Sequence, residues 1–60
     1  MNIDFIRLRE VLINYFGTAV YLNPLAQMDL IEVENASNEK LLEIAINNGF
    51  DLENFKTKEY

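Results

Sequence analysis

Paired carboxylates are the residues whose spacing comes closest to a chemical site in this sequence. Asp29 and Glu32 lie three residues apart, and Glu39 and Glu43 lie four apart. On a helix each pair would share one turn and could converge on a cation. Calcium, however, takes about six to eight oxygen ligands from a shaped loop, and the sequence contains no such loop. We therefore expect a solvated acidic face that holds no metal and no other cofactor.

The residue types that usually perform catalysis are missing. The chain has neither Cys nor His, so it lacks a thiol nucleophile, the usual general base and the commonest transition-metal ligand. Its only serine, Ser37, precedes a helical pattern and is better explained as a helix cap. Gly17 and Gly49 stand alone and cannot form a phosphate-binding loop. The sequence predicts no catalytic residue, no small-molecule substrate and no enzyme.

The charge balance disfavours nucleic acids and membranes as partners. Ten acids against five bases give a formal net charge of −5, and Lys40 is the only base between residues 29 and 53. Such a surface repels the phosphates of nucleic acids and of anionic lipids. Arg7 and Arg9 are too few to reverse this effect, and Arg7 has Glu10 as an expected partner one turn further on.

The chain is also short for a protein that folds alone. We interpret residues 1–60 as one small helical domain, and a domain of this size buries only about 60% of the surface of its unfolded chain. Such domains usually need a disulfide, a metal or an oligomeric partner. Only self-association remains here. Because no signal peptide and no apolar run of about 20 residues is visible, the cytoplasm is the default location.

Residues Ile3 to Phe16 predict the first helix. Apolar side chains recur there at spacings of three and four, which places them on one face. We expect Asn2 to cap the start of this helix, and Gly17 to end it in a left-handed conformation.

The segment that follows permits two interpretations. Residues 18–22 tolerate a strand, and Asn23-Pro24 is a strong helix start, with Asn as the cap and Pro at the first helical position. We expect a second helix from Pro24 to about Glu34. The alternative is an α+β fold with a β-hairpin around residues 18–33.

The third helix has the clearest signals. Ser37 is expected to cap a helix over residues 38–48, and Gly49 with Phe50 to end it. Asp51 should then cap a short turn from Leu52 to about Phe55, and residues 57–60 should fray. The stretch from Leu41 to Phe55 resembles the end of leader domains in some bacterial precursors of peptide natural products, which also close a helix with a Gly-aromatic-Asp turn. The resemblance covers about a quarter of the chain and identifies no family.

The sequence thus predicts an all-α domain of three helices with a short fourth turn and the first helix at its centre. We expect the core to contain Phe5, Leu8, Leu12, Phe16, Met28, Ile31, Leu41, Ile44, Ala45, Phe50 and Phe55.

Surplus apolar residues suggest how the chain acts. Ile6 and Ile13 lie beside the apolar stripe of the first helix, and Ile46, one turn after Leu42, falls on the polar side of the third. In a small domain such residues point to a partner. We expect a protein–protein interaction module, with a homodimer among its complexes. The alternative is an acidic decoy that occupies a nucleic-acid-binding protein.

Overall fold

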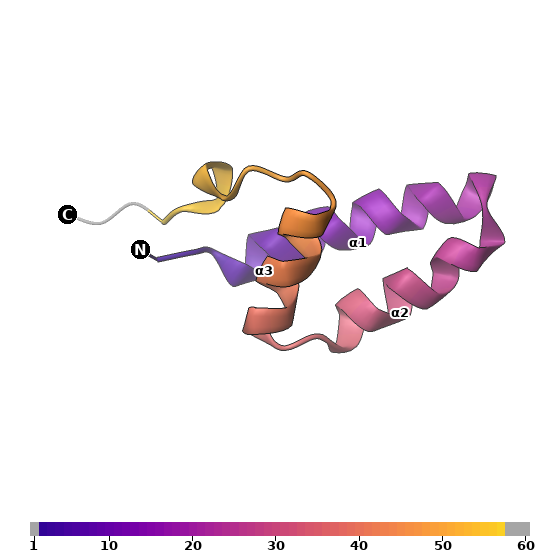
Figure 1. The fold of residues 1–60 in the computed structure, drawn as a ribbon, viewed down its shortest axis with the longest axis horizontal. Helices are drawn as coiled ribbons and strands as arrows, with labels where there is room; N and C mark the ends of the chain where they lie inside the picture. The colour runs from indigo at the N-terminus through magenta and orange to yellow at the C-terminus, as the bar shows by residue number, and fades with distance from the viewer. Residues whose placement is uncertain (1, 58–60) are drawn as a thin grey trace.

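Two antiparallel helices joined by a tight turn form the long axis of the structure, and a third helix packs across the end of this hairpin that is farthest from the turn (Figure 1). The computed structural model describes residues 2–57, and within this range it confirms the all-α fold. The elements are α1 (Phe5–Leu22), the 3₁₀ turn η1 (Pro24–Ala26), α2 (Gln27–Asn35), α3 (Asn38–Asn47) and the 3₁₀ turn η2 (Leu52–Phe55). As predicted, α1 is central, because it packs against every other element.

The first helix is longer than predicted and begins later. Its N-cap is Asp4, whose Oδ1 accepts a hydrogen bond from the Arg7 backbone N–H at 3.1 Å, so Asn2 is not the cap. Gly17 does not end the helix, which continues to Leu22. A glycine ends a helix only where it adopts a positive φ, and Gly17 does not. The last turns of α1 pack instead against η1 and α2, which favours continued helix.

The end of the third helix is the glycine ending that the sequence predicts. Gly49 has a φ of 80°, and its N–H bonds to the carbonyl of Ile46 at 3.1 Å. The N–H of Phe50 bonds to the carbonyl of Ala45 at 2.9 Å, which completes a Schellman motif. The Ser37 cap at the start of α3 is confirmed as well, with its Oγ accepting from the Lys40 N–H at 3.2 Å.

The two glycines predict opposite effects of alanine. At Gly17 an added Cβ meets no atom within 4 Å, so Gly17→Ala should stabilise the protein by about 0.5–1 kcal/mol through helix propensity. At Gly49 the positive φ strains any Cβ, so Gly49→Ala should destabilise by about 1 kcal/mol. Urea unfolding followed by circular dichroism measures both. Effects of the same sign would contradict the assigned backbone conformations.

Helical structure begins at Pro24 as predicted, but α2 itself begins three residues later, at Gln27, and it turns a different face inward. The side chain of Asn23 accepts a hydrogen bond from the Leu25 N–H, and Pro24 opens the 3₁₀ turn that leads into α2. The hairpin alternative for residues 18–33 is therefore wrong, since this stretch is helical apart from Asn23. Ala26 and Val33 are the buried residues of η1 and α2.

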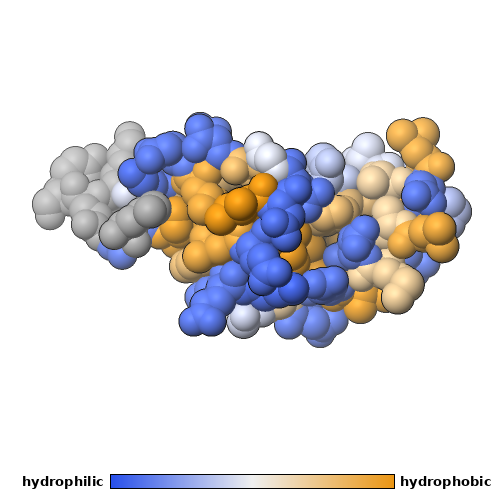
Figure 2. Space-filling view, viewed as in Figure 1, coloured by the Kyte–Doolittle hydropathy of each residue, from blue (hydrophilic) through white to orange (hydrophobic). Residues whose placement is uncertain are grey.

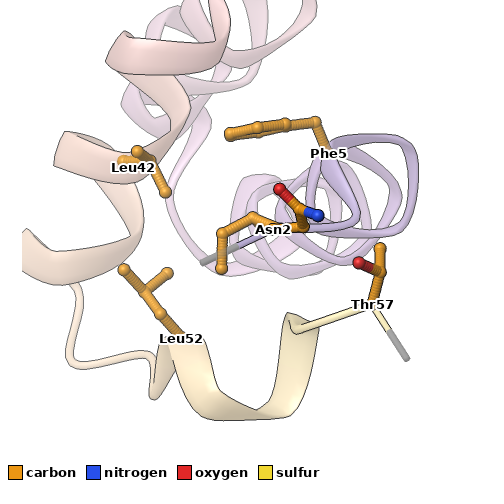
Figure 3. A pocket seen from close by; sticks show the side chains of 6 residues that line it. Asn2, Phe5, Leu42, Leu52 and Thr57 are labelled. Carbon is orange, nitrogen blue, oxygen red and sulfur yellow. The ribbon is translucent and has the colours of Figure 1, made fainter. Parts of the chain in front are cut away.

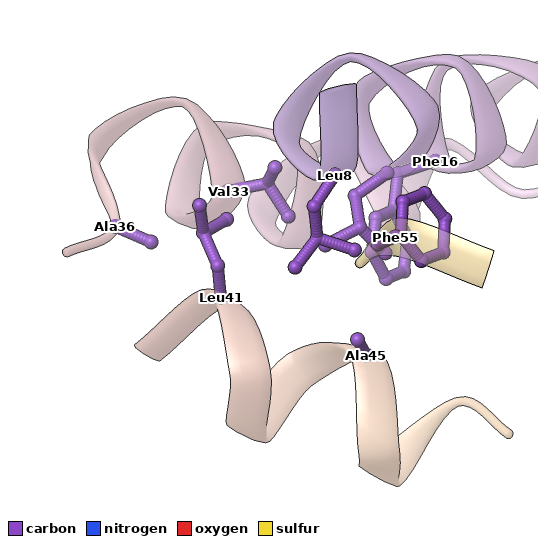
Figure 4. Close-up of a cluster of buried hydrophobic side chains, with 8 residues drawn as sticks. Leu8, Phe16, Val33, Ala36, Leu41, Ala45 and Phe55 are labelled. Carbon is purple, nitrogen blue, oxygen red and sulfur yellow. The ribbon is translucent and has the colours of Figure 1, made fainter. Parts of the chain in front are cut away.

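The core lies where the three helices meet (Figure 4). Leu8, Leu12 and Leu41 are fully enclosed. The predicted core residues Phe16, Ala45 and Phe55 are also buried, while Phe5, Ile44 and Phe50 pack against the cluster from its edge. Met28 and Ile31 were wrongly assigned to the core, because α2 directs them to solvent. Their places are taken by Val33 and Ala36, which the sequence analysis missed.

The partly buried side chain of Arg9 links the two helices of the hairpin through hydrogen bonds. Its guanidinium donates to three carbonyl oxygens at the C-terminal end of α2, those of Val33 at 2.9 Å, Glu34 at 3.2 Å and Ala36 at 2.8 Å. Carbonyls at this end of a helix carry the negative end of its dipole, and of the three only that of Val33 also has a backbone donor within residues 2–57, the Ala36 N–H at 3.3 Å. A cation at this position therefore both closes α2 and holds it against α1.

The two ends of the described chain pair with each other. Ile3 and Lys56 form an isolated antiparallel bridge, with Asp4 N–H donating to the Phe55 carbonyl at 2.7 Å and Thr57 N–H to the Asn2 carbonyl at 2.9 Å. Thr57 is therefore tied down, contrary to the expectation of fraying from residue 57. Residues 58–60, for which fraying was also predicted, lie outside the described residues. The paired ends lie opposite the hairpin turn (Figure 1).

Candidate interaction surface

The four residues predicted to contact a partner fall into two classes. Ile6 and Ile46 are exposed, so their apolar side chains are available to another molecule. Ile13 and Leu42 are partly buried and pack against the hydrophobic core. Neither predicted pair therefore forms a wholly exposed surface. Single exposed apolar residues are normal in folded proteins. An interaction surface is therefore expected where several of them lie together.

Several do meet at the turn of the hairpin. We call Tyr21, Leu22, Leu25 and Met28 the apolar tip. Their exposed fractions are 93%, 89%, 77% and 75%, the largest among the big apolar side chains apart from Ile6. Figure 2 shows hydrophobic surface at this end of the molecule, the end farthest from the chain termini. The tip is built by the last turn of α1, by η1 and by the first turn of α2.

The geometry of the fold explains why the side chains of the apolar tip are exposed. The molecule measures 43 × 18 × 17 Å, because the hairpin extends well beyond α3 (Figure 1). The core that α3 and η2 close therefore lies at the other end, and the residues at the turn have only each other to pack against. Within the tip, Asn23 and Pro24 fix the turn while the large side chains point outward.

No charged residue lies in the chain from Val11 to Met28. All the described charges belong to residues 4–10 and 29–56, so the four tip residues come from an uncharged stretch of an acidic protein, and Asp29 in the first turn of α2 is the nearest charge along the chain. Sequence reasoning missed these tip residues as a site because it looked for irregular residues within helical patterns. The missing charge over so long a stretch was the signal that could have identified them.

The bases within residues 2–57 all contact groups of the chain itself, and Lys56 pairs with Glu53 at 2.9 Å. Besides Arg9, Arg7 donates to the Asn54 carbonyl at 3.2 Å and lies over the Phe55 ring, so the expected Arg7–Glu10 pair is replaced. Lys40 lies 3.3 Å from Glu32 and 3.5 Å from Glu43, and these carboxylates raise the pKa of its ammonium, the Glu32 hydrogen bond most strongly.

The predicted carboxylate pairs do not form a metal centre. Asp29, Glu32 and Lys40 line one shallow polar hollow beside Phe16 and Ile44, so a cation from the chain itself already lies among the acids. Within residues 2–57 no three Asp or Glu side chains converge closely enough to hold a metal ion.

A second hollow lies at the opposite end from the tip, between the N-terminal segment, α3 and η2 (Figure 3). It has a volume of about 520 Å³, with Phe5, Leu42 and Leu52 forming its apolar walls and Asn2 and Thr57 beside them. None of its lining side chains is an acid or a base, and Thr57 contributes the one hydroxyl.

Two further findings complete the description. Within residues 2–57, no helix combines the length and the hydrophobicity that crossing a bilayer requires. No protein family model, curated protein or solved structure matches this chain.

Proposed function

We propose that this chain is a non-enzymatic interaction module that binds another protein through the apolar tip. The observation that carries the proposal is the gathering of four large, exposed apolar side chains at one end of the fold, all from a stretch of the chain without charged residues. Clustered exposed apolar groups of this kind mark interaction sites in soluble proteins, whereas scattered ones do not. The lack of Cys and His, the residue types that most often serve as nucleophile and general base, supports a role in binding. A chain without Cys also needs no oxidising compartment, which supports a cytoplasmic setting.

The size of the tip sets the strength of the complex. Burying each of its side chains contributes about 1.5–3 kcal/mol, so the four together contribute on the order of 6–12 kcal/mol. Association costs about 4–15 kcal/mol in lost freedom of motion. The tip alone therefore supports a reversible complex, and polar contacts at its rim must add to it.

Site-specific photo-crosslinking in cells tests the proposal. A benzophenone amino acid replaces Tyr21 at the tip or, as a matched aromatic control, Tyr15, which packs edge-on against Phe16 and Phe50. We expect adducts from position 21 that disappear when Leu25→Asp is added, and that form again from the purified components. Adducts that form equally from position 15, or that persist with Leu25→Asp, would show that the tip is not the binding surface.

The acidic surface favours a second candidate function, a decoy for a basic protein. The described bases contact other groups of the chain, while carboxylates such as Asp29, Glu34 and Glu39 are exposed to solvent. Like-signed surfaces of this kind steer basic partners. Binding to a purified nucleic-acid-binding protein should then weaken steeply as salt rises, because screening acts on exposed charges. Affinity that is constant between low and high salt would contradict the decoy function.

A further inference from the structure

We infer that the partner of the apolar tip is a second copy of this chain, and that two copies pack tip to tip around a twofold axis. This inference rests on the proposed function, and it adds the identity of the partner and the geometry of the complex. Three properties of the tip support it: its charge, its area and its shape.

The charge distribution favours self-association at the tip. Each copy carries a formal net charge of −5, so most ways of joining two copies bring acids together. Contact through Tyr21, Leu22 and Leu25 avoids this, because the chain is uncharged from Val11 to Met28. The molecule is 43 Å long, and the N-terminal segment and η2, which carry Asp4 and Asp51, lie at the end away from the tip (Figure 1). Since the Debye length is about 8 Å at physiological salt, the acidic ends of two copies joined at their tips are screened from each other.

The exposed area suits a small homodimer. Four side chains of these sizes present apolar surface on the order of 500 Å². A standard interface buries about 800 Å² on each partner, polar rim included. In a twofold dimer the same patch is used on both copies, so each tip residue contributes twice. The apolar core of a small but specific interface is therefore present on a single chain.

The shape of the tip favours another hairpin over a flat surface. Consecutive residues Ala19, Val20, Tyr21 and Leu22 cover a full turn of α1, so apolar groups surround the helix end. A flat partner leaves one side of such an end in water, whereas a second hairpin end packs alongside it. The dimer also supplies the stabilising association that a chain of 60 residues without disulfides usually needs.

Sedimentation equilibrium of the full chain tests the inference with two matched variants. Leu25 at the tip and Ile6 at the start of α1 have the same exposed fraction, 77%. We expect a reversible dimer whose dissociation constant Leu25→Asp raises at least about 100-fold, since the change removes a buried contact twice in a symmetric interface. Ile6→Asp should change the constant less than about threefold. Circular dichroism confirms that both variants keep their helices.

Disulfide trapping then tests the geometry, because the natural chain has no cysteine. Leu22→Cys should give a crosslinked dimer under mild oxidation. Ile6→Cys should not, since about 24 Å of helix separates position 6 from position 22. Equal crosslinking at both positions would overturn the tip-to-tip arrangement.

The outcomes separate this inference from the proposed function. A protein that stays monomeric at every concentration, but is crosslinked at position 21 to a different protein, overturns self-association and leaves the proposed function standing. A dimer that Leu25→Asp does not weaken places the interface elsewhere and overturns the inference. A monomer that floats with neutral phosphatidylcholine vesicles, and no longer does so as Leu25→Asp, assigns the tip to a lipid surface and overturns both.

Discussion

Replacement of Leu12 by alanine should remove most of the stability of this protein. Leu12 is fully enclosed among residues of the central cluster, so its truncation leaves a cavity in the only core that the described residues form. Such changes cost about 2–5 kcal/mol. A domain of this size has only about 3–5 kcal/mol in total. The midpoint of urea unfolding should therefore fall by about 2–3 M, with a large unfolded fraction before urea is added.

Leu22→Ala is the matched control for this prediction. It is the same substitution in the same helix, but the Leu22 side chain is almost fully exposed. At a protein concentration too low for association, it should change stability by less than about 0.5 kcal/mol. If both variants lose the same stability, or if Leu12→Ala loses less than about 1 kcal/mol, the central cluster is not the core of the protein.

The parts of the fold that could be predicted from sequence are those that depend on neighbours in the chain. Ser37 caps α3 with a bond to a residue three positions away, and Asp51 caps η2 with a bond to Glu53. The Schellman ending at Gly49 joins residues at most five positions apart. Signals of this kind are complete within a short window of sequence, which is why the boundaries of α3 and η2 were nearly correct.

The parts that could not be predicted depend on contacts between distant segments. A glycine inside a helix and a glycine that ends one are identical in sequence, and only packing of the last turns of α1 on η1 and α2 distinguishes Gly17 from Gly49. The inward face of α2 was also ambiguous, because Met28 and Ile31 fit a helical spacing as well as the buried Val33 does. Which face is buried is decided by the neighbouring helix.

The interaction surface shows the same division. The exposure of Ile46 agrees with its position on the polar side of the helical wheel. Ile6 and Ile13 share one side of the first helix, and only the fold shows that Ile6 is exposed while Ile13 packs against the core. The apolar tip depends on two facts that appear only in three dimensions: that α1 continues to Leu22, and that α3 covers only one end of the hairpin. A first helix ending at Phe16 would have placed these residues in a loop, with no shared surface.

Substitution of Arg9 should have the second-largest effect on stability, about 2–4 kcal/mol for Arg9→Met. The three carbonyl oxygens that its guanidinium contacts belong to residues 24–27 positions further along the chain, so these bonds fix how α2 lies on α1. Methionine keeps the packing of the apolar stem but leaves the carbonyls of Val33 and Ala36 without these donors. Thermal and urea unfolding of the monomeric protein measure the loss.

Two further variants show how much of the stabilisation by Arg9 comes from the geometry of its guanidinium and how much from its positive charge. Arg9→Lys keeps a cation near the helix end but cannot hold all three oxygens, so it should recover less than half of the loss. Arg7→Met removes the same residue type two positions away, where one carbonyl is contacted, and should cost about 1 kcal/mol or less.

Since the oxygens bound by Arg9 are backbone carbonyls, the contribution of Arg9 to stability should also be constant from about pH 5 to pH 9. A contribution that disappears as carboxylates are protonated would instead identify an ion pair with an acid, and would contradict the role of Arg9 as the cap of α2.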